Sequence, residues 1–266
     1  MRTIGGGSGI HYVENGEFGA PAVVFIHGFP FSHAMWARQL ETVGRTHRAI
    51  AYDLRGHGAS DVGDGQYTIE GHVDDLLLLL DHLGLARVTL VGLSMGGYVA
   101  LRAVERAPGR CGALVLCDTR SEADGNEAKL KRAAGAAAVK RDGAAAFAAG
   151  FVKAVFAPGT FRTRPEAVAA IRLIIENTDP VAIAGTLIAL AGRTDTTASL
   201  AAIRVPTLVL VGEHDAVTPP DAARSLHDRI AGSELHLVPD AGHLANLENP
   251  DFFDAKLLDF LGRHGR

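Results

Sequence analysis

The feature that most constrains this chain is the run Gly-Leu-Ser-Met-Gly-Gly at residues 92–97. It follows an apolar run, Arg87–Val91, that has the pattern of a buried strand, and it precedes a stretch with helical spacing. A strand, a G-x-S-x-G turn and a helix form a nucleophile elbow, a turn so tight that only glycine fits at positions 92 and 96. Such an elbow would hold Ser94 on a strained backbone at the top of a sheet. The alternative interpretation is a glycine-rich turn without a chemical role.

Strand and helix patterns alternate in the first 118 residues and again near the end of the chain. The predicted strands cover residues 22–26, 48–52, 87–91, 112–117, 207–211 and 234–238. The predicted helices include one from Thr68 to a stop at Gly84, one after Pro220 and a last one from Pro250 to Leu261. This alternation predicts an α/β fold, with a mostly parallel sheet flanked by helices on both faces.

The segment between these two halves has a different composition. Residues 120–196 are rich in alanine and show no strand pattern, and their helical patterns break at Gly143, Pro158, Pro165 and Pro180. We expect a helical cap at 120–196, inserted into a core formed by 1–119 and 197–266. The cap would lie over the carboxyl edge of the sheet, where open α/β sheets bind ligands. A separate domain is the alternative, but it would have a poor core of its own. Whether Gly5–Gly9 is a hairpin turn or a linker stays open.

Charge and composition exclude several classes of partner. A formal net charge of −4 over 266 residues gives no attraction to nucleic acid or to an anionic membrane. The longest leucine run, Leu76–Leu80, is too short to span a bilayer. The first residues lack the apolar segment of a signal peptide, and Cys111 and Cys117 lie too far apart along one predicted strand to form a disulfide. We therefore expect a soluble, cytoplasmic protein, whose oligomeric state the sequence leaves open.

A serine nucleophile needs a histidine base, and the base needs a carboxylate that fixes its tautomer. His243 lies in the loop after the last predicted strand and ahead of the final helix. Asp215 comes directly after the strand at 207–211, and Asp118, which ends the strand at 112–117, is a rival acid. The chain order Ser94, Asp215, His243 favours Asp215, because it is the order found in α/β-hydrolases.

An oxyanion hole requires two backbone N–H groups aimed at the developing negative charge. Met95 follows the nucleophile at the positive end of its helix and supplies one of them. The loop after the strand at 22–26 reads His27-Gly-Phe-Pro30, and Pro30 has no N–H, which leaves Phe29 as the second donor. His27 could act as a base, but we interpret it as a structural residue that holds this loop.

Five motifs in this order resemble the α/β-hydrolase superfamily. They are His27–Pro30, Asp53–Ser60, Gly92–Gly97, Pro206–Asp215 and Ala241–His243. Within the superfamily the chain is most similar to the 3-oxoadipate enol-lactonase group, through Leu114–Thr119, Thr178–Pro180, Val217–Pro220 and His243–Pro250. The resemblance implies hydrolysis of a small-molecule ester or lactone through an acyl-enzyme, without a metal or cofactor. It also implies that Arg55 and His57 belong to a structural turn.

Other functions on the same fold stay open. They are an acyl-homoserine lactonase, a general short-chain carboxylesterase, a metal-free haloperoxidase or perhydrolase, and a non-enzymatic small-molecule sensor.

We expect the substrate pocket to combine residues of the oxyanion loop and of the cap. The candidates are Phe29, Phe31, His33 and Trp36 from the loop, and Phe147, Phe151 and Phe156 from the cap. The cap phenylalanines could instead only pack the cap onto the core. Arg120 is the candidate partner for a substrate carboxylate. The alternative for Arg120 is a solvated arginine at the rim, paired with Asp118 or Glu122.

Overall fold

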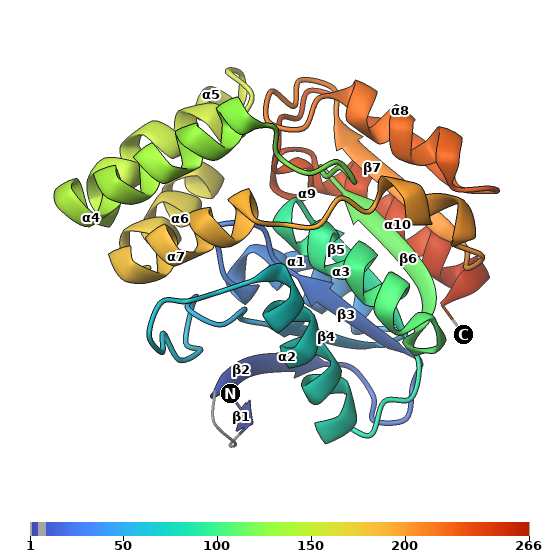
Figure 1. Cartoon of the computed structure of the whole chain (residues 1–266). Helices are drawn as coiled ribbons and strands as arrows, with labels where there is room; N and C mark the ends of the chain where they lie inside the picture. Colours follow the sequence, from blue (N-terminus) through green and yellow to red (C-terminus); the bar gives the residue numbers. More distant parts are fainter. Residues whose placement is uncertain (1, 5–8, 266) are drawn as a thin grey trace.

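An eight-stranded sheet forms the centre of the molecule (Figure 1). The computed structural model describes residues 2–4 and 9–265. The strands, in chain order, are β1 (Arg2–Ile4), β2 (Ile10–Asn15), β3 (Ala22–Ile26), β4 (Arg48–Tyr52), β5 (Val88–Leu93), β6 (Cys111–Cys117), β7 (Thr207–Gly212) and β8 (Glu234–Val238). They lie in the order β1-β2-β4-β3-β5-β6-β7-β8. Strands β3 to β8 pair in parallel, and β1 and β2 form an antiparallel edge, which confirms the predicted mostly parallel sheet.

The central strands are continuous apolar runs because both faces of the sheet are covered. Every residue of β3, β4, β5 and β7 is buried. Strand β5 runs two residues further than predicted, through Gly92 to Leu93, because both residues pair with β6. At the other edge, β1 and β2 pair antiparallel on either side of the glycine run. The choice between a turn and a linker there depends on residues 5–8, which lie outside the described residues.

Helices cover both faces of the sheet. They are α1 (Ala37–Val43), α2 (Ile69–His82), α3 (Met95–Arg106), α8 (Pro220–Arg229), α9 (Ala245–Glu248) and α10 (Pro250–His264), with short 3₁₀ turns at His33–Trp36, Pro108–Arg110 and Thr197–Ala202. In Figure 1, α2 and α3 lie in front of the sheet, and α1 and α10 lie behind it. Helix α2 begins as predicted, because the Thr68 side chain accepts a hydrogen bond from the N–H of Gly71.

Four helices lie between β6 and β7 in the chain, and we call them the inserted helices. They are α4 (Asn126–Val155), α5 (Thr160–Thr163), α6 (Pro165–Glu176) and α7 (Pro180–Ala191). Helix α4 is broken at Gly143, whose φ is 82° and ψ is 170°. The inserted helices stand together to one side of the sheet (Figure 1), and their buried side chains are continuous with its apolar core. The apolar core of the molecule therefore extends from the sheet into the inserted helices.

In the described part of the chain, no single helix is long and apolar enough to cross a membrane. The pair α6 and α7 passes a test of length and composition only when taken together, and it is bent by 97°. Cys111 and Cys117 are both free thiols, buried at the two ends of β6.

Candidate active site

Ser94 occupies a sharp turn between the end of β5 and the start of α3. Its φ of 54° and ψ of −113° are unusual for a residue with a side chain, and such strain is common at functional sites. Neighbouring groups hold the turn: the N–H of Ser94 donates to the carbonyl of Cys117 (2.9 Å), and the hydroxyl of Thr119 donates to the carbonyl of Ser94 (2.8 Å). A Cβ at Gly96 would lie 2.1 Å from the carbonyl oxygen of Ile26. The backbone therefore has the geometry expected of a nucleophile elbow.

The structure brings Ser94, His243 and Asp215 together at the carboxyl edge of the sheet. Nε2 of His243 lies 2.9 Å from Oγ of Ser94, and Nδ1 lies 2.8 Å from Oδ2 of Asp215. All three residues are buried, and Ser94 is only 9% exposed. The chain order and these distances match a Ser-His-Asp triad, in which the imidazole can move a proton from the serine hydroxyl.

The turn after β7 supplies Asp215 with hydrogen-bond donors. Its Oδ1 accepts from the N–H groups of Val217 (2.8 Å) and Thr218 (2.9 Å), and its Oδ2 accepts from the hydroxyl of Thr218 (2.7 Å). Burial alone would raise the pKa of Asp215, but His243 and the Thr218 donors outweigh burial and hold this pKa below its ordinary value. Asp215 is therefore suited to stabilise an imidazolium at His243.

Asp118, the rival acid, has a different environment. Its Oδ1 accepts from the N–H of Gly212 (2.8 Å), and its Oδ2 has no hydrogen-bond partner among the described residues. Burial, with a further contribution from nearby Asp215, raises the pKa of Asp118 well above its ordinary value. In the described part of the chain, Asp118 makes no hydrogen bond to His243.

The loop after β3 lies against the elbow, which brings the two predicted oxyanion donors to the same region. A Cβ at Gly28 would lie 3.0 Å from the Leu93 side chain, and a Cβ at Gly96 would lie 2.9 Å from the carbonyl oxygen of His27. Neither the N–H of Phe29 nor that of Met95 donates a hydrogen bond within the described residues. Both are available to a carbonyl oxygen of a bound substrate.

His27 uses both ring nitrogens on the backbone of this region. Its Nδ1 donates to the carbonyl of Gly28 (2.8 Å), and its Nε2 accepts from the N–H of Leu54 (2.9 Å). Burial lowers the pKa of His27 to about 4. This neutral, doubly bonded imidazole fits the structural role that we expected for it.

Two predicted pocket residues from the inserted helices meet the oxyanion loop. The ring centroids of Phe147 and Phe151 lie 5.9 Å and 5.7 Å from that of Phe29, and Phe151 also lies 6.2 Å from Phe31. The two α4 rings stack on each other at 5.1 Å. Phe156 instead packs against Phe161, within the inserted helices. An aromatic cluster of Phe29, Phe31, Phe147 and Phe151 therefore joins α4 to the oxyanion loop.

Two other predicted pocket residues lie outside this aromatic cluster. Trp36 is fully buried, with its ring 5.1 Å from Phe25 and 6.2 Å from Phe253. His33 is held by Asp53, whose Oδ1 lies 2.8 Å from Nδ1 of the histidine. Both residues belong to the 3₁₀ turn at His33–Trp36.

Arg120 makes a hydrogen bond to the turn that carries the acid. Its guanidinium donates to the carbonyl of Val217 (2.6 Å), two residues after Asp215. The expected alternative pairing with Asp118 or Glu122 does not occur in the described part of the chain. The remaining guanidinium donors are available to a ligand.

His11, His33 and Asp53 have ligand atoms within 4.8 Å of one another, a spacing that a metal ion could occupy. Both carboxylate oxygens of Asp53 already accept backbone N–H groups, from His33 (2.7 Å) and Ala59 (2.9 Å). The 2.8 Å from Nδ1 of His33 to Asp53 is a hydrogen-bond distance. These contacts describe a hydrogen-bonded cluster, which holds the start of the 53–60 turn.

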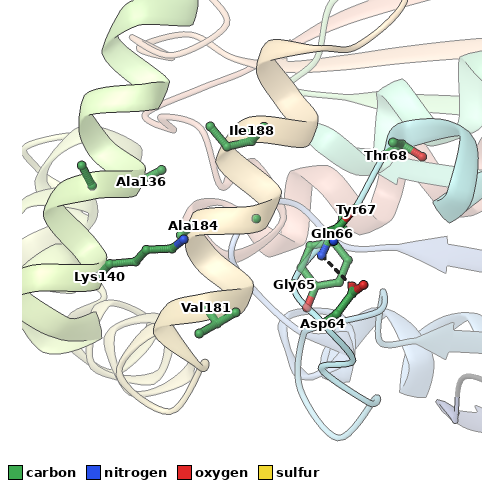
Figure 2. A pocket seen from close by; sticks show the side chains of 12 residues that line it. Asp64, Gly65, Gln66, Tyr67, Thr68, Ala136, Lys140, Val181, Ala184 and Ile188 are labelled. Atoms are coloured by element: carbon green, nitrogen blue, oxygen red, sulfur yellow. Dashed lines mark hydrogen bonds between the residues drawn. The ribbon is translucent and has the colours of Figure 1, made fainter.

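A groove of about 840 Å³ lies between residues 64–68 and helices α4 and α7 (Figure 2). Lys140 and Ala184 line it on the helices, and Asp64 and Tyr67 line it on the loop. None of the residues that line this groove belongs to the triad or to the oxyanion loop. The groove is therefore separate from the chemistry at Ser94.

The sequence analysis missed three polar residues that support this site. Thr119 and Thr218 bond to Ser94 and Asp215, and Glu248 bonds to the residues on both sides of His243. Thr218 and Glu248 lie within motifs that carried the resemblance, and Thr119 ends a third. Their position a few residues after each acid or base was the available signal.

Comparisons with known proteins agree with this fold. A family model described as the alpha/beta hydrolase fold matches residues 21–250. A thermophilic esterase from Thermogutta terrifontis is 37% identical, with a TM-score of 0.93 over 96% of this chain and 94% of the esterase.

Two enol-lactonases are also similar to the chain. The structure of the enol-lactonase from Burkholderia xenovorans LB400 is 32% identical, with a TM-score of 0.90 over 96% of this chain and 97% of that protein. The 3-oxoadipate enol-lactonase 2 of Acinetobacter baylyi is 29% identical over 245 residues, which cover 92% of this chain and 90% of that protein. These findings confirm the resemblance drawn from the motifs. The chain belongs to the α/β-hydrolase family and is a hydrolase.

Proposed function

We propose that this protein is a serine hydrolase that opens small lactones or cleaves small esters through an acyl-enzyme on Ser94. The observation that carries the proposal is the hydrogen-bonded series from Oγ of Ser94 through His243 to Asp215, next to two free backbone donors. A serine in such a setting can attack a carbonyl carbon at neutral pH.

The first half of the reaction forms the acyl-enzyme. The substrate carbonyl oxygen accepts from the N–H groups of Phe29 and Met95, and Oγ of Ser94 attacks the carbonyl carbon while Nε2 of His243 takes the hydroxyl proton. Asp215 stabilises the imidazolium through Nδ1. Nε2 then gives the proton to the leaving oxygen as the ester bond breaks.

The second half releases the acid. Nε2 of His243 takes a proton from water, the hydroxide attacks the acyl carbon, and the proton returns to Oγ of Ser94 as the bond to serine breaks. With a lactone, the leaving alcohol stays attached to the acyl group, so the product is a single ring-opened acid. An enol-lactone gives an enol that becomes a keto acid.

We propose that the inserted helices act as the cap over this site, and that Phe31, Phe147 and Phe151 contact the substrate. Their ring contacts with Phe29 support this assignment, because they bring α4 beside the oxyanion donor. Trp36 and His33 make no ring contact with Phe29 in the described part of the chain, so this cluster does not support them as pocket residues; their rings contact Phe25, Phe253 and His11. Arg120 stays our candidate for binding a substrate carboxylate.

The names of two relatives favour a cyclic substrate. One is an enol-lactonase and another a 3-oxoadipate enol-lactonase, each covered over most of its length. A third relative is an esterase, which supports activity on open-chain esters as well. We therefore propose a small lactone, such as an enol-lactone with a free carboxylate, as the preferred substrate class.

A panel of substrates tests this proposal. The purified protein is assayed with p-nitrophenyl acetate, with 3-oxoadipate enol-lactone, with an acyl-homoserine lactone, and for peroxide-dependent bromination. We expect kcat/KM to be highest for the enol-lactone. A higher value for acyl-homoserine lactone would change the substrate class but not the chemistry. Turnover of no substrate above the blank, with a ligand-induced change in the inserted helices, would favour a sensor over an enzyme.

A further inference from the structure

Glu248, the last residue of α9, is a buried carboxylate surrounded only by hydrogen-bond donors. It is 8% exposed. Oε1 accepts from the N–H groups of Gly242 (2.9 Å) and Leu244 (3.1 Å). Oε2 accepts from the N–H of Ala157 (2.8 Å) and from the hydroxyl of Thr160. Each of the two oxygens of Glu248 therefore accepts two hydrogen bonds.

These donors come from two segments that are far apart in the sequence. Gly242 and Leu244 are the neighbours of His243, in the loop after β8. Ala157 and Thr160 lie just after the end of α4, in the inserted helices. One carboxylate therefore ties the loop that carries the base to the inserted helices.

Two further contacts join the same segments. The N–H of His243 donates to the carbonyl of Val155, the last residue of α4 (2.9 Å). A Cβ at Gly242 would lie 2.6 Å from the nitrogen of Ala157 and 3.1 Å from Oε1 of Glu248. The loop thus lies so close to the end of α4 that position 242 has no room for a side chain.

Helix α4 contacts the other half of the site as well. Its Phe147 and Phe151 pack on Phe29, whose N–H is a proposed oxyanion donor. The same helix is therefore attached to the oxyanion loop at one place and to the His243 loop at another. A shift of α4 would therefore change the distance between the imidazole of His243 and the N–H of Phe29.

We propose that Glu248 is a positioning residue that sets His243 against Ser94 by fastening the His243 loop to the end of α4. This inference rests on the proposed function. It assigns Glu248 no contact with the substrate. Through Glu248, the position of the inserted helices controls how well the imidazole is aligned with the serine hydroxyl.

The test compares Glu248→Gln with Asp75→Asn. A glutamine amide has one acceptor oxygen and one donor nitrogen, so two of the four donors around Glu248 lose their acceptor. Asp75 is a matched control: it is 3% exposed and bonds through both oxygens to Arg55, outside the triad and the oxyanion loop. The measurements are the rate at which a fluorophosphonate labels Ser94, kcat and KM for the best ester, and Tm.

We expect Glu248→Gln to lower the labelling rate and kcat by about 10- to 100-fold, with KM changed little, because a small misplacement of a catalytic group costs this much. Asp75→Asn should lower Tm by about as much as Glu248→Gln does. Its Ser94 should still be labelled at the wild-type rate. Labelling of Glu248→Gln within twofold of wild type would overturn the inference, and so would an equal loss in Asp75→Asn.

A second variant decides the question if Glu248→Gln does not fold. Thr160→Val removes one donor from Oε2 and keeps the size of the side chain, and we expect a several-fold slower labelling of Ser94. Labelling at the wild-type rate would overturn the inference. Failure of the fluorophosphonate to label the wild-type protein at Ser94 would overturn the proposed function itself, and this inference with it.

Discussion

Asp118 and Asp215 follow neighbouring parallel strands, β6 and β7, yet only Asp215 bonds to the imidazole of His243. Asp118 bonds instead to the N–H of Gly212, at the end of β7. Asp215 is held below its ordinary pKa by His243 and its donors, and Asp118 is raised above its ordinary pKa by burial. The pKa values of these two buried carboxyl groups are thus shifted in opposite directions, and the one with the lowered pKa bonds to the base.

This contrast predicts different effects of removing each acid. Asp215→Asn should lower kcat by about 10³- to 10⁴-fold, because the amide favours the wrong tautomer of His243. Asp118→Asn should change kcat less than tenfold, because Asp118 bonds to the N–H of Gly212 and not to His243, and the amide oxygen of asparagine can still accept from that N–H. Steady-state kinetics of both variants on one ester checks this prediction. The reverse order of effects would assign the catalytic acid to Asp118.

Three buried histidines predict a loss of stability in acid. Burial lowers the pKa of His27 to about 4 and the pKa values of His57 and His72 to about 3, from an ordinary value of 6.5. Between pH 6.5 and these lowered pKa values, the unfolded chain binds protons that the folded chain does not. The contribution of the neutral histidines to the free energy of unfolding is therefore fully present above pH 6.5 and is lost as the pH falls. Each histidine contributes up to about 1.4 kcal/mol per pH unit.

Denaturant unfolding at pH 7, 6 and 5 measures this slope. His72→Leu should reduce the slope of the unfolding free energy against pH by the contribution of one histidine. The substitution is suitable because Nε2 of His72 has no partner among the described residues and leucine fills a similar volume. An unfolding free energy that stays constant from pH 6.5 to 4.5 in the wild-type protein would contradict the neutral state of these histidines.

Arg120 predicts a dependence on substrate charge. Arg120→Ala should raise KM for a lactone that carries a free carboxylate and leave KM for a neutral ester unchanged, because the guanidinium would bind the carboxylate. Paired assays on the two substrates measure this difference. Equal losses on both would show that Arg120 acts only through its hydrogen bond to Val217, as a support of the Asp215 turn.

The sequence predicted the parallel sheet, and it placed the three triad residues at the positions where the structure brings them together. The sheet and the elbow depended on local rules, and the choice of Asp215 over Asp118 depended on the chain order of α/β-hydrolases. Continuous apolar runs mark strands that are covered on both faces. Gly92 allows the close approach of the backbone at Gly96, and Gly96 allows the close approach of the elbow to β3 at Ile26. The breaks in the inserted helices also followed local signals, at Gly143 and before Pro165 and Pro180.

Features that depend on distant contacts could not be read in this way. Trp36 lies in a segment of no clear period, so the sequence could not tell that its side chain packs against Phe25 and Phe253. The partners of Glu248 just after the end of α4 are about 90 residues away in the chain, as in the bond from Ala157. Pairing with β6 also carried β5 through Gly92, a residue that usually weakens a strand.

The most direct test of this account is kcat of Ser94→Ala on the best substrate of the panel. The variant should fold normally, since it removes one hydroxyl whose hydrogen bond, among the described residues, is to His243 alone. We expect kcat to fall by at least about 10³-fold, as it does when a triad member is lost, with Tm close to that of the wild-type protein. Retention of a tenth of the wild-type activity by a folded Ser94→Ala variant would contradict the assignment of Ser94 as the nucleophile.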